Sequence, residues 1–133
     1  MRRTLRSYGA LAAALLLAAP IAGCAAAVAA GAAGGIYATT RGVESIVTGS
    51  VDQVAERAQT VMQQMNIVQQ GSSTDDAEAK RSFKGKQGDL DITIDLAQQD
   101  TATTKVEVYA RKNLAEWDKG YAREVLQRIV AEK

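Results

Sequence analysis

The chain has 133 residues, of which 47% are hydrophobic and 23% are charged, and its formal net charge is +1. This length predicts a single domain. A near-neutral charge gives no reason to expect nucleic-acid binding, which requires a basic footprint. Histidine is absent from the whole chain, so the commonest acid/base group and metal ligand at neutral pH is missing. We therefore expect no enzyme, no metal site, no cofactor and no nucleic-acid partner.

Residues 1–23 have the three parts of a secretion signal. The segment begins with MRRTLRS, continues with an apolar run over residues 10–19 and ends in small residues before Cys24. The apolar run is too short to span a bilayer as a mature helix. We expect residues 1–23 to be removed. Three of the 16 basic residues lie there, so 13 basic residues would remain against 15 acidic ones.

The four residues that end this signal are similar to the bacterial lipobox: Ile21, Ala22, Gly23 and Cys24. The resemblance implies a diacylglycerol thioether on the Cys24 sulfur, cleavage before it, and acylation of the new amino group by a fatty acid such as palmitate. Several acyl chains hold a protein on a membrane where one chain would not. Cys24 is the only cysteine, so it has no disulfide partner. The alternatives are a free thiol in a secreted protein, and an uncleaved anchor helix over residues 10–37.

Residues 24–42 are rich in alanine and glycine and show no amphipathic period, which is typical of a tether between a lipid and a domain. The residue after the cysteine is Ala25. In enteric-type bacteria an aspartate there signals retention in the inner membrane. The sequence therefore predicts a lipid-anchored protein in the cell envelope, at the outer membrane and facing the periplasm.

The segment 43–133 is predicted to fold as the periplasmic domain. Apolar and polar residues alternate over 43–48, as in a strand. Ser50-Val51-Asp52-Gln53 has the form of a capping box, which predicts the start of a helix. Apolar residues then recur at helical spacing in one stripe: Val51, Val54, Ala55, Ala58, Val61, Met62 and Met65.

After this helix a short strand is expected over 67–70. Glycine, serine, threonine and aspartate cluster over 71–76 and predict a turn. Residues 79–87 alternate again as a strand. Lysines line the exposed side of this strand, as they do on a protected edge strand. The alternative use of such a lysine row is contact with anionic headgroups or a cell-wall polymer.

The most regular alternation lies in residues 89–96, and a second alternating segment follows over 104–111. An antiparallel hairpin would set Asp91 and Asp95 near Lys105 and Arg111 as ordinary cross-strand pairs. The same aspartates could form a catalytic carboxylate pair or a metal site. No histidine supports such a site. We therefore predict cross-strand pairing, with no catalytic residue.

Asp118 is the expected N-cap of a final helix, whose apolar side comprises Tyr121, Ala122, Val125, Leu126, Ile129 and Val130. The alternating strands predict an antiparallel sheet with one covered face, and two amphipathic helices supply the cover. The fold class is therefore α+β: a two-layer sandwich of four to five antiparallel strands with two helices on one face, preceded by the signal and tether.

Several segments of the chain resemble a family of small bacterial lipoproteins, domain of unknown function 3568. They are the alanine–glycine run after Cys24, TGSVDQVAERA, DLDITIDL, VEVY and AREVLQRI, between Cys24 and Lys133. These are patterns that form a fold, so the resemblance implies a lipoprotein location and no established activity. A glycine is typical of this family before the acidic residue at the last helix start, where this chain has Trp117.

We expect the domain to be a non-enzymatic interaction or structural module that contacts an envelope protein or the cell wall while the lipid holds it to the membrane. The alternative is a periplasmic domain that binds a small ligand or a lipid. Its pocket would lie between the sheet and the helices, lined by Met62, Met65, Phe83 or Trp117.

Overall fold

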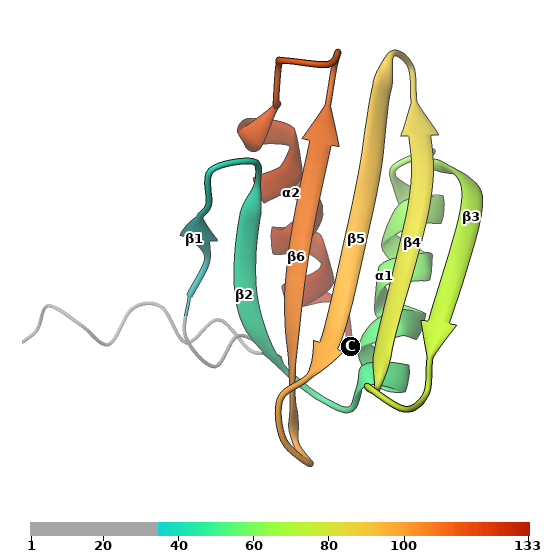
Figure 1. Cartoon of the computed structure of the whole chain (residues 1–133), viewed down its shortest axis with the longest axis vertical. Coiled ribbons are helices and arrows are strands. Elements are labelled where there is room, and N and C mark those ends of the chain that lie inside the picture. Colours follow the sequence, from blue (N-terminus) through green and yellow to red (C-terminus); the bar gives the residue numbers. More distant parts are fainter. Residues whose placement is uncertain (1–34) are drawn as a thin grey trace, which may run out of the picture.

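The computed structural model describes residues 35–133 of the chain. Six strands and two helices follow one another: β1 Tyr37–Ala38, β2 Val43–Thr48, α1 Val51–Gln64, β3 Val68–Asp75, β4 Lys80–Gln87, β5 Leu90–Gln98, β6 Thr103–Arg111 and α2 Lys119–Ala131. The strands form one sheet, and both helices lie behind it in Figure 1. The predicted α+β two-layer architecture is confirmed.

The strands lie in the order β1-β2-β6-β5-β4-β3, and every neighbouring pair is antiparallel. The sheet therefore has six strands, where the sequence predicted four to five. The additional strand is β1, which pairs Tyr37 with Glu44 and Ala38 with Val43. It falls in the stretch 24–42 that composition assigned to the tether, so the sheet begins before Val43.

The predicted turn over 71–76 is wrong for most of its length, because Gly71 to Asp75 belong to β3. This strand pairs with β4 from Val68 opposite Lys86 to Asp75 opposite Lys80, with a bulge between Gln69 and Gly71. β3 is the last strand of the sheet, and nearly all of its residues are exposed. Polar residues are therefore tolerated there, and no apolar alternation marks the strand. Its strand geometry comes from backbone hydrogen bonds to β4, which side-chain patterns do not reveal. The predicted edge strand, β4, therefore lies between two neighbours.

The core lies between the sheet and the helices. β5 and β6 bury alternate residues against it: Leu90, Ile92, Ile94 and Leu96 from β5, and Val106, Val108 and Ala110 from β6. The apolar stripe of α1 is buried from Val51 to Met62, and α2 buries the five residues from Ala122 to Val130 that the sequence assigned to its apolar side. Burial of one apolar face per element therefore holds the two layers together.

Both helices begin where their capping residues predict. At α1 the Ser50 hydroxyl accepts from the Gln53 backbone N–H at 3.3 Å, and the Gln53 side chain accepts from the Ser50 N–H at 3.0 Å. At α2 the Asp118 carboxylate accepts from the Tyr121 N–H at 2.8 Å. These contacts satisfy amide groups that the first turn of a helix leaves free.

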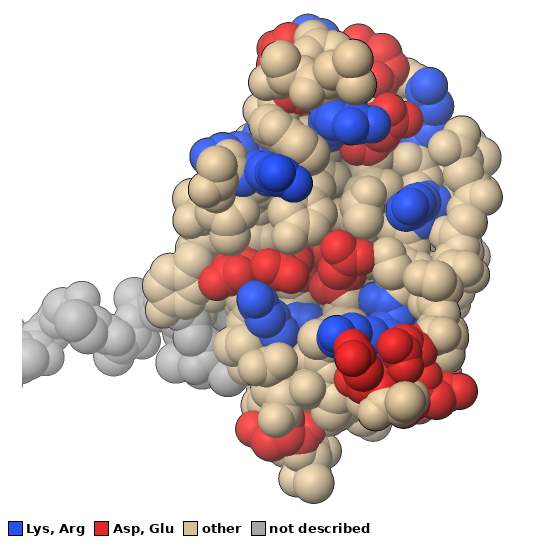
Figure 2. Space-filling model, in the orientation of Figure 1, with Lys and Arg blue, Asp and Glu red and all other residues tan. Residues whose placement is uncertain are grey.

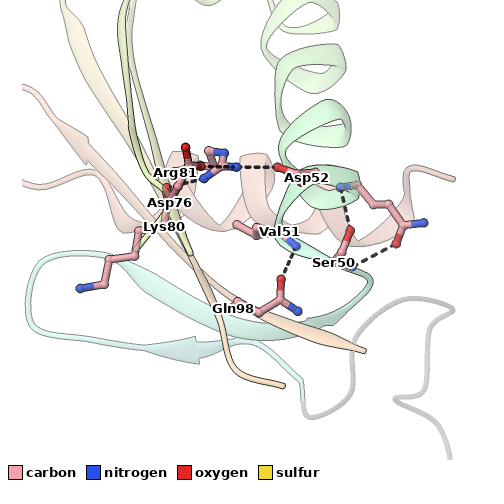
Figure 3. A network of polar contacts seen from close by, with 8 residues as sticks. Ser50, Val51, Asp52, Asp76, Lys80, Arg81 and Gln98 are labelled. Atoms are coloured by element: carbon pink, nitrogen blue, oxygen red, sulfur yellow. Dashed lines mark hydrogen bonds and ion pairs between the residues drawn. The ribbon is translucent and has the colours of Figure 1, made fainter. Parts of the chain in front are cut away.

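The first turn of α1 is also held to the sheet, as Figure 3 shows. The Val51 N–H donates to the Gln98 side chain of β5 at 2.7 Å. Arg81 of β4 contacts Asp52 at 2.8 Å and Asp76 at 3.2 Å. The helix dipole stabilises an acidic residue in the first turn of a helix. Asp52 occupies this position, and it also forms the ion pair with the Arg81 guanidinium. The network therefore joins the first turn of α1 to β4 and β5 of the sheet.

Gly85 of β4 leaves no room for a side chain, because α1 and the segment that follows it lie close to this position. A Cβ atom placed there would lie 2.6 Å from Ile67 Cγ2, 2.8 Å from Met62 Cε and 3.0 Å from the Val68 carbonyl oxygen. Gly71, in the neighbouring strand, has no atom within 4 Å of the same position. The two glycines therefore differ in the space that they leave for a side chain.

We predict that Gly85→Ala lowers the free energy of unfolding by about 1–3 kcal/mol through overpacking. Gly71→Ala is the matched control and should change it by no more than about 0.5 kcal/mol. Urea unfolding followed by circular dichroism measures both. Equal effects of the two substitutions would contradict the packing described for β4.

Candidate functional site

The sheet face opposite the helices is open in residues 35–133, and Figure 2 views it directly. Strands of period two that bury one face must present their remaining residues on the other. Charged and polar side chains therefore gather on this face. In Figure 2 an acidic band crosses its centre, with basic groups on both sides of the band.

The acidic band is a row of three carboxylates in register across β2, β6 and β5. Glu107 lies opposite Glu44 on one side and opposite Asp95 on the other. Like charges directly opposite each other destabilise a sheet. Lys105 offsets part of the repulsion, because its ammonium lies 3.3 Å from Glu44 and 3.2 Å from Glu107. Asp95 accepts a hydrogen bond from the Ser82 hydroxyl at 2.5 Å instead.

Two hollows lie on this face, and they share Asp95. The Lys80 hollow, of about 400 Å³, lies over β3 to β6 and is lined by Ser73, Thr74, Asp75, Lys80, Arg81, Ser82, Asp95, Leu96, Ala97, Lys105 and Glu107. The Trp117 hollow, of about 390 Å³, is lined by Arg41, Asp91, Thr93, Asp95, Tyr109, Arg111 and Trp117. Both volumes fall in the range of about 300–1,000 Å³ that is typical of ligand sites.

Trp117 reaches the open face through the segment that joins β6 to α2. The Asn113 side chain accepts from the Ala115 and Glu116 backbone N–H groups at 3.0 Å each, which closes a turn. Trp117 then forms a β-bridge with Arg111. Its ring meets that of Tyr109 edge to face, with the centroids 6.3 Å apart and the planes at 65°. The two rings form an aromatic corner of the Trp117 hollow.

The cations of the two hollows differ in the ion pairs that they form. In the Lys80 hollow both outward-facing lysines contact carboxylates: Lys80 contacts Glu78, and Lys105 contacts Glu44 and Glu107. The Arg81 side chain points to the other side of the sheet, where it contacts Asp52 of α1. In the Trp117 hollow Arg111 lies 4.0 Å from Asp91, and Arg41 forms no ion pair with a residue of the range 35–133. Polar groups of the Trp117 hollow are therefore available to a ligand.

The predicted cross-strand pairs are confirmed for Asp91 and wrong for Lys105. Asp91 lies opposite Arg111, as predicted, and is also 3.9 Å from Lys86. The register sets Asp95 opposite Glu107 and Lys105 opposite Ala97. Lys105 consequently contacts the glutamates of β2 and β6. The pattern of alternation placed these residues on the correct face, but the register decided their partners.

The pocket predicted between sheet and helices is not formed by the residues named for it. Met62 and Phe83 are core residues with 1% and 5% of their surface exposed, and Met65 packs against the same core. Trp117 lines the hollow on the open face instead. The four side chains therefore do not line one common cavity.

Three further sequence expectations concern residues 1–34 or absences. The signal 1–23 and the lipidation residues Ile21, Ala22, Gly23 and Cys24 lie outside the described residues. Within residues 35–133 no cluster of three or more acidic, cysteine or histidine side chains is arranged to hold a metal ion. None of the helices described is both long and apolar enough to cross a membrane.

The sequence assigned neither Arg41 nor Glu44 to a site, and it placed Trp117 in a pocket between the sheet and the helices. Arg41 comes from the β1–β2 connection, and Trp117 from the loop before α2. Glu44 joins the acidic row through the β2–β6 register, although β2 and β6 are far apart in sequence. The available signal was the outward position of Glu44 and Glu107 in their strands. Only the topology brings them side by side.

The groups of the open face with a raised pKa include the Tyr109 phenol and the Lys105 ammonium. Burial raises the pKa of the Tyr109 phenol, and the charges of Glu107 and Asp95 raise it further. The hydrogen bond to Glu107 raises the pKa of the Lys105 ammonium, and Glu44 adds to this effect. Both groups therefore hold their protons more tightly in the folded chain than in the unfolded chain.

We predict that alkaline pH destabilises this face. A raised folded-state pKa contributes stability that is complete below the ordinary values of 10.0 for Tyr109 and 10.5 for Lys105, and that is lost as the pH rises through the raised values. Tyr109→Phe has no phenol to ionise, so its free energy of unfolding should fall less than that of wild type as the pH rises from about 9 to about 11. Urea unfolding across this range measures the difference, and equal slopes for the two proteins would contradict the prediction.

A comparison with protein families gives one match. A family profile described as "Protein of unknown function (DUF3568)" matches residues 8–112, which is most of the chain. The match starts before Cys24 and ends before α2. No curated protein matches the chain, and no solved structure does. The extent of the profile match shows that the chain belongs to the DUF3568 family of proteins of unknown function.

Proposed function

We propose that this chain is a lipid-anchored envelope protein, at the outer membrane and facing the periplasm, that binds another envelope component without catalysing a reaction. The proposal has two parts, an anchor and a binding surface. Different residues support each part, and each part has its own test.

The anchor rests on Cys24 and its neighbours. Positive residues, an apolar run and Ile21-Ala22-Gly23 precede the only cysteine of the chain. The family profile runs through these positions, since it covers residues 8–112. The segment therefore lies within the part of the chain that the family model matches. Lipidation would use the thiol of Cys24 for membrane attachment. Several acyl chains make such attachment long-lived.

The binding surface rests on one observation: the open sheet face carries two adjoining hollows that share Asp95. Both hollows are bordered by charged and hydroxyl side chains, and Trp117 and Tyr109 supply apolar area at one end. Aromatic rings and arginine are the residue types that binding surfaces favour. The whole chain has no histidine and, apart from Cys24, no thiol, which favours binding over catalysis.

The Trp117 hollow also supports the alternative function, binding of a small ligand. Its lining includes two arginines and two aspartates, so it suits a polar ligand better than a lipid tail. Small-ligand binding would therefore use the open face of the sheet.

We predict that cells expressing the wild-type chain incorporate a fatty-acid analogue into it, whereas Cys24→Ala incorporates none because no thiolate is present to take the lipid. Ala25→Ser keeps the thiol and is the matched control, which should be labelled like wild type. Density-gradient fractionation should place the labelled protein with the outer membrane. Label on the Cys24→Ala variant, or wild type in the soluble fraction, would refute the anchor.

We predict that the open face contacts an envelope component. A photo-crosslinking amino acid at Thr93, in the Trp117 hollow, should give a discrete adduct in intact envelopes. The same amino acid at Gln59, which is exposed on α1, is the control and should not give that adduct. Adducts of equal yield at both positions, or none at Thr93, would contradict a binding role for this face.

A further inference from the structure

We propose that the Trp117 hollow binds a pyranose ring of an extended, uncharged glycan. This inference rests on the proposed function, because it names the chemistry of the component that the open face would contact. It is carried by three features of the hollow: its aromatic corner, its balanced charge and its open shape.

The aromatic corner supplies apolar surface on which a sugar ring can stack. Trp117 and Tyr109 meet edge to face, so one ring braces the other and the pair presents a rigid surface. One side of a pyranose is a sheet of C–H groups, and the electron-rich face of an aromatic ring attracts such polarised hydrogens. Trp117 is only partly exposed, so stacking a sugar on it requires little reordering of the side chain.

The charged groups of the hollow occur as two donors and two acceptors. Arg41 and Arg111 donate, and Asp91 and Asp95 accept. A sugar hydroxyl both donates and accepts, so neighbouring hydroxyls satisfy a carboxylate and a guanidinium together. The hollow has no net charge, which favours an uncharged polyhydroxylated ligand over an anion or a cation.

Asp95 is the central acceptor of this site. The Ser82 hydroxyl donates to its Oδ1 at 2.5 Å, which fixes the carboxylate while leaving acceptor capacity on Oδ2. Glu107 lies opposite it and has Lys105 as its own partner. Because the carboxylates of the acidic row repel one another, an additional hydrogen-bond donor would stabilise the Asp95 carboxylate. A sugar hydroxyl supplies such a donor without adding charge.

The shape of the hollow suits a chain that lies across the sheet. The volume of about 390 Å³ is open to solvent on the side away from the helices. The hollow continues through Asp95 into the Lys80 hollow, whose two lysines, Lys80 and Lys105, are already paired with carboxylates. A glycan seated on Trp117 therefore has a polar path along which its next rings can run.

The test uses the full chain purified in detergent micelles. Trp117 is the only tryptophan, so its fluorescence reports directly on the hollow. We expect a saturable fluorescence change with a tetramer of β-1,4-linked N-acetylglucosamine or with maltotetraose. Comparing the two separates a cell-wall type of linkage from a glucan. If neither sugar gives a saturable fluorescence change, the proposal is overturned.

Asp95→Asn keeps the shape of the side chain and should weaken binding about tenfold, the expected loss of a hydrogen bond to a charged acceptor. Asp89→Asn, at an exposed aspartate outside both hollows, is the matched control and should bind like wild type. Circular dichroism checks that both variants fold. If Asp95→Asn folds and binds as tightly as wild type, the site is elsewhere and the proposal fails.

The outcome is distinguishable from failure of the proposed function. A protein adduct at Thr93 without sugar binding would leave the open face as a binding surface and reject the glycan. Sugar binding by the purified chain in the absence of fatty-acid labelling would reject the anchor and leave the glycan site standing.

Discussion

The alternation of side chains along β5 and β6 is the constraint on which the rest of the structure depends. These two strands lie at the centre of the sheet, and each buries every second residue under the helices. A shift of one residue in either strand would turn its apolar residues to solvent. The same register therefore fixes the core and, on the opposite side, the order of charges across the open face.

The open face is arranged at a cost to stability. Glu44, Glu107 and Asp95 lie in register, and only Lys105 offers a short ion pair to two of them. A sequence selected for stability alone would alternate charges along this row. Strain of this kind is expected where a surface serves binding. The core, in contrast, follows local rules throughout, with capped helices and apolar stripes that face the sheet.

How much the sequence predicted depended on whether the signal was local. The capping box at Ser50, the N-cap at Asp118 and the strands β2, β4, β5 and β6 follow from neighbouring residues, and all were predicted. β3 was missed over Gly71 to Asp75 because an edge strand with polar residues has no alternation to detect. β1 was missed because two residues carry no period. The candidate site depends on the β2–β6 and β5–β6 registers and on a loop, none of which side-chain spacing encodes.

The two edges of the sheet differ in length, and this difference determines how the domain would respond to a pull. β3 ends one edge with eight residues, whereas β1 ends the other with two, joined to β2 by two residue pairs and by the Ser45 hydroxyl, which donates to the Gly35 carbonyl at 2.7 Å. Force applied to the chain ahead of Gly35 reaches the sheet through this short strand. β1 would separate from β2 first and release a few residues of extended chain, while β2, β6 and β5 keep their pairing. The short edge would thus yield first, and Arg41, which lies on the β1–β2 connection, would move away from the Trp117 hollow with it.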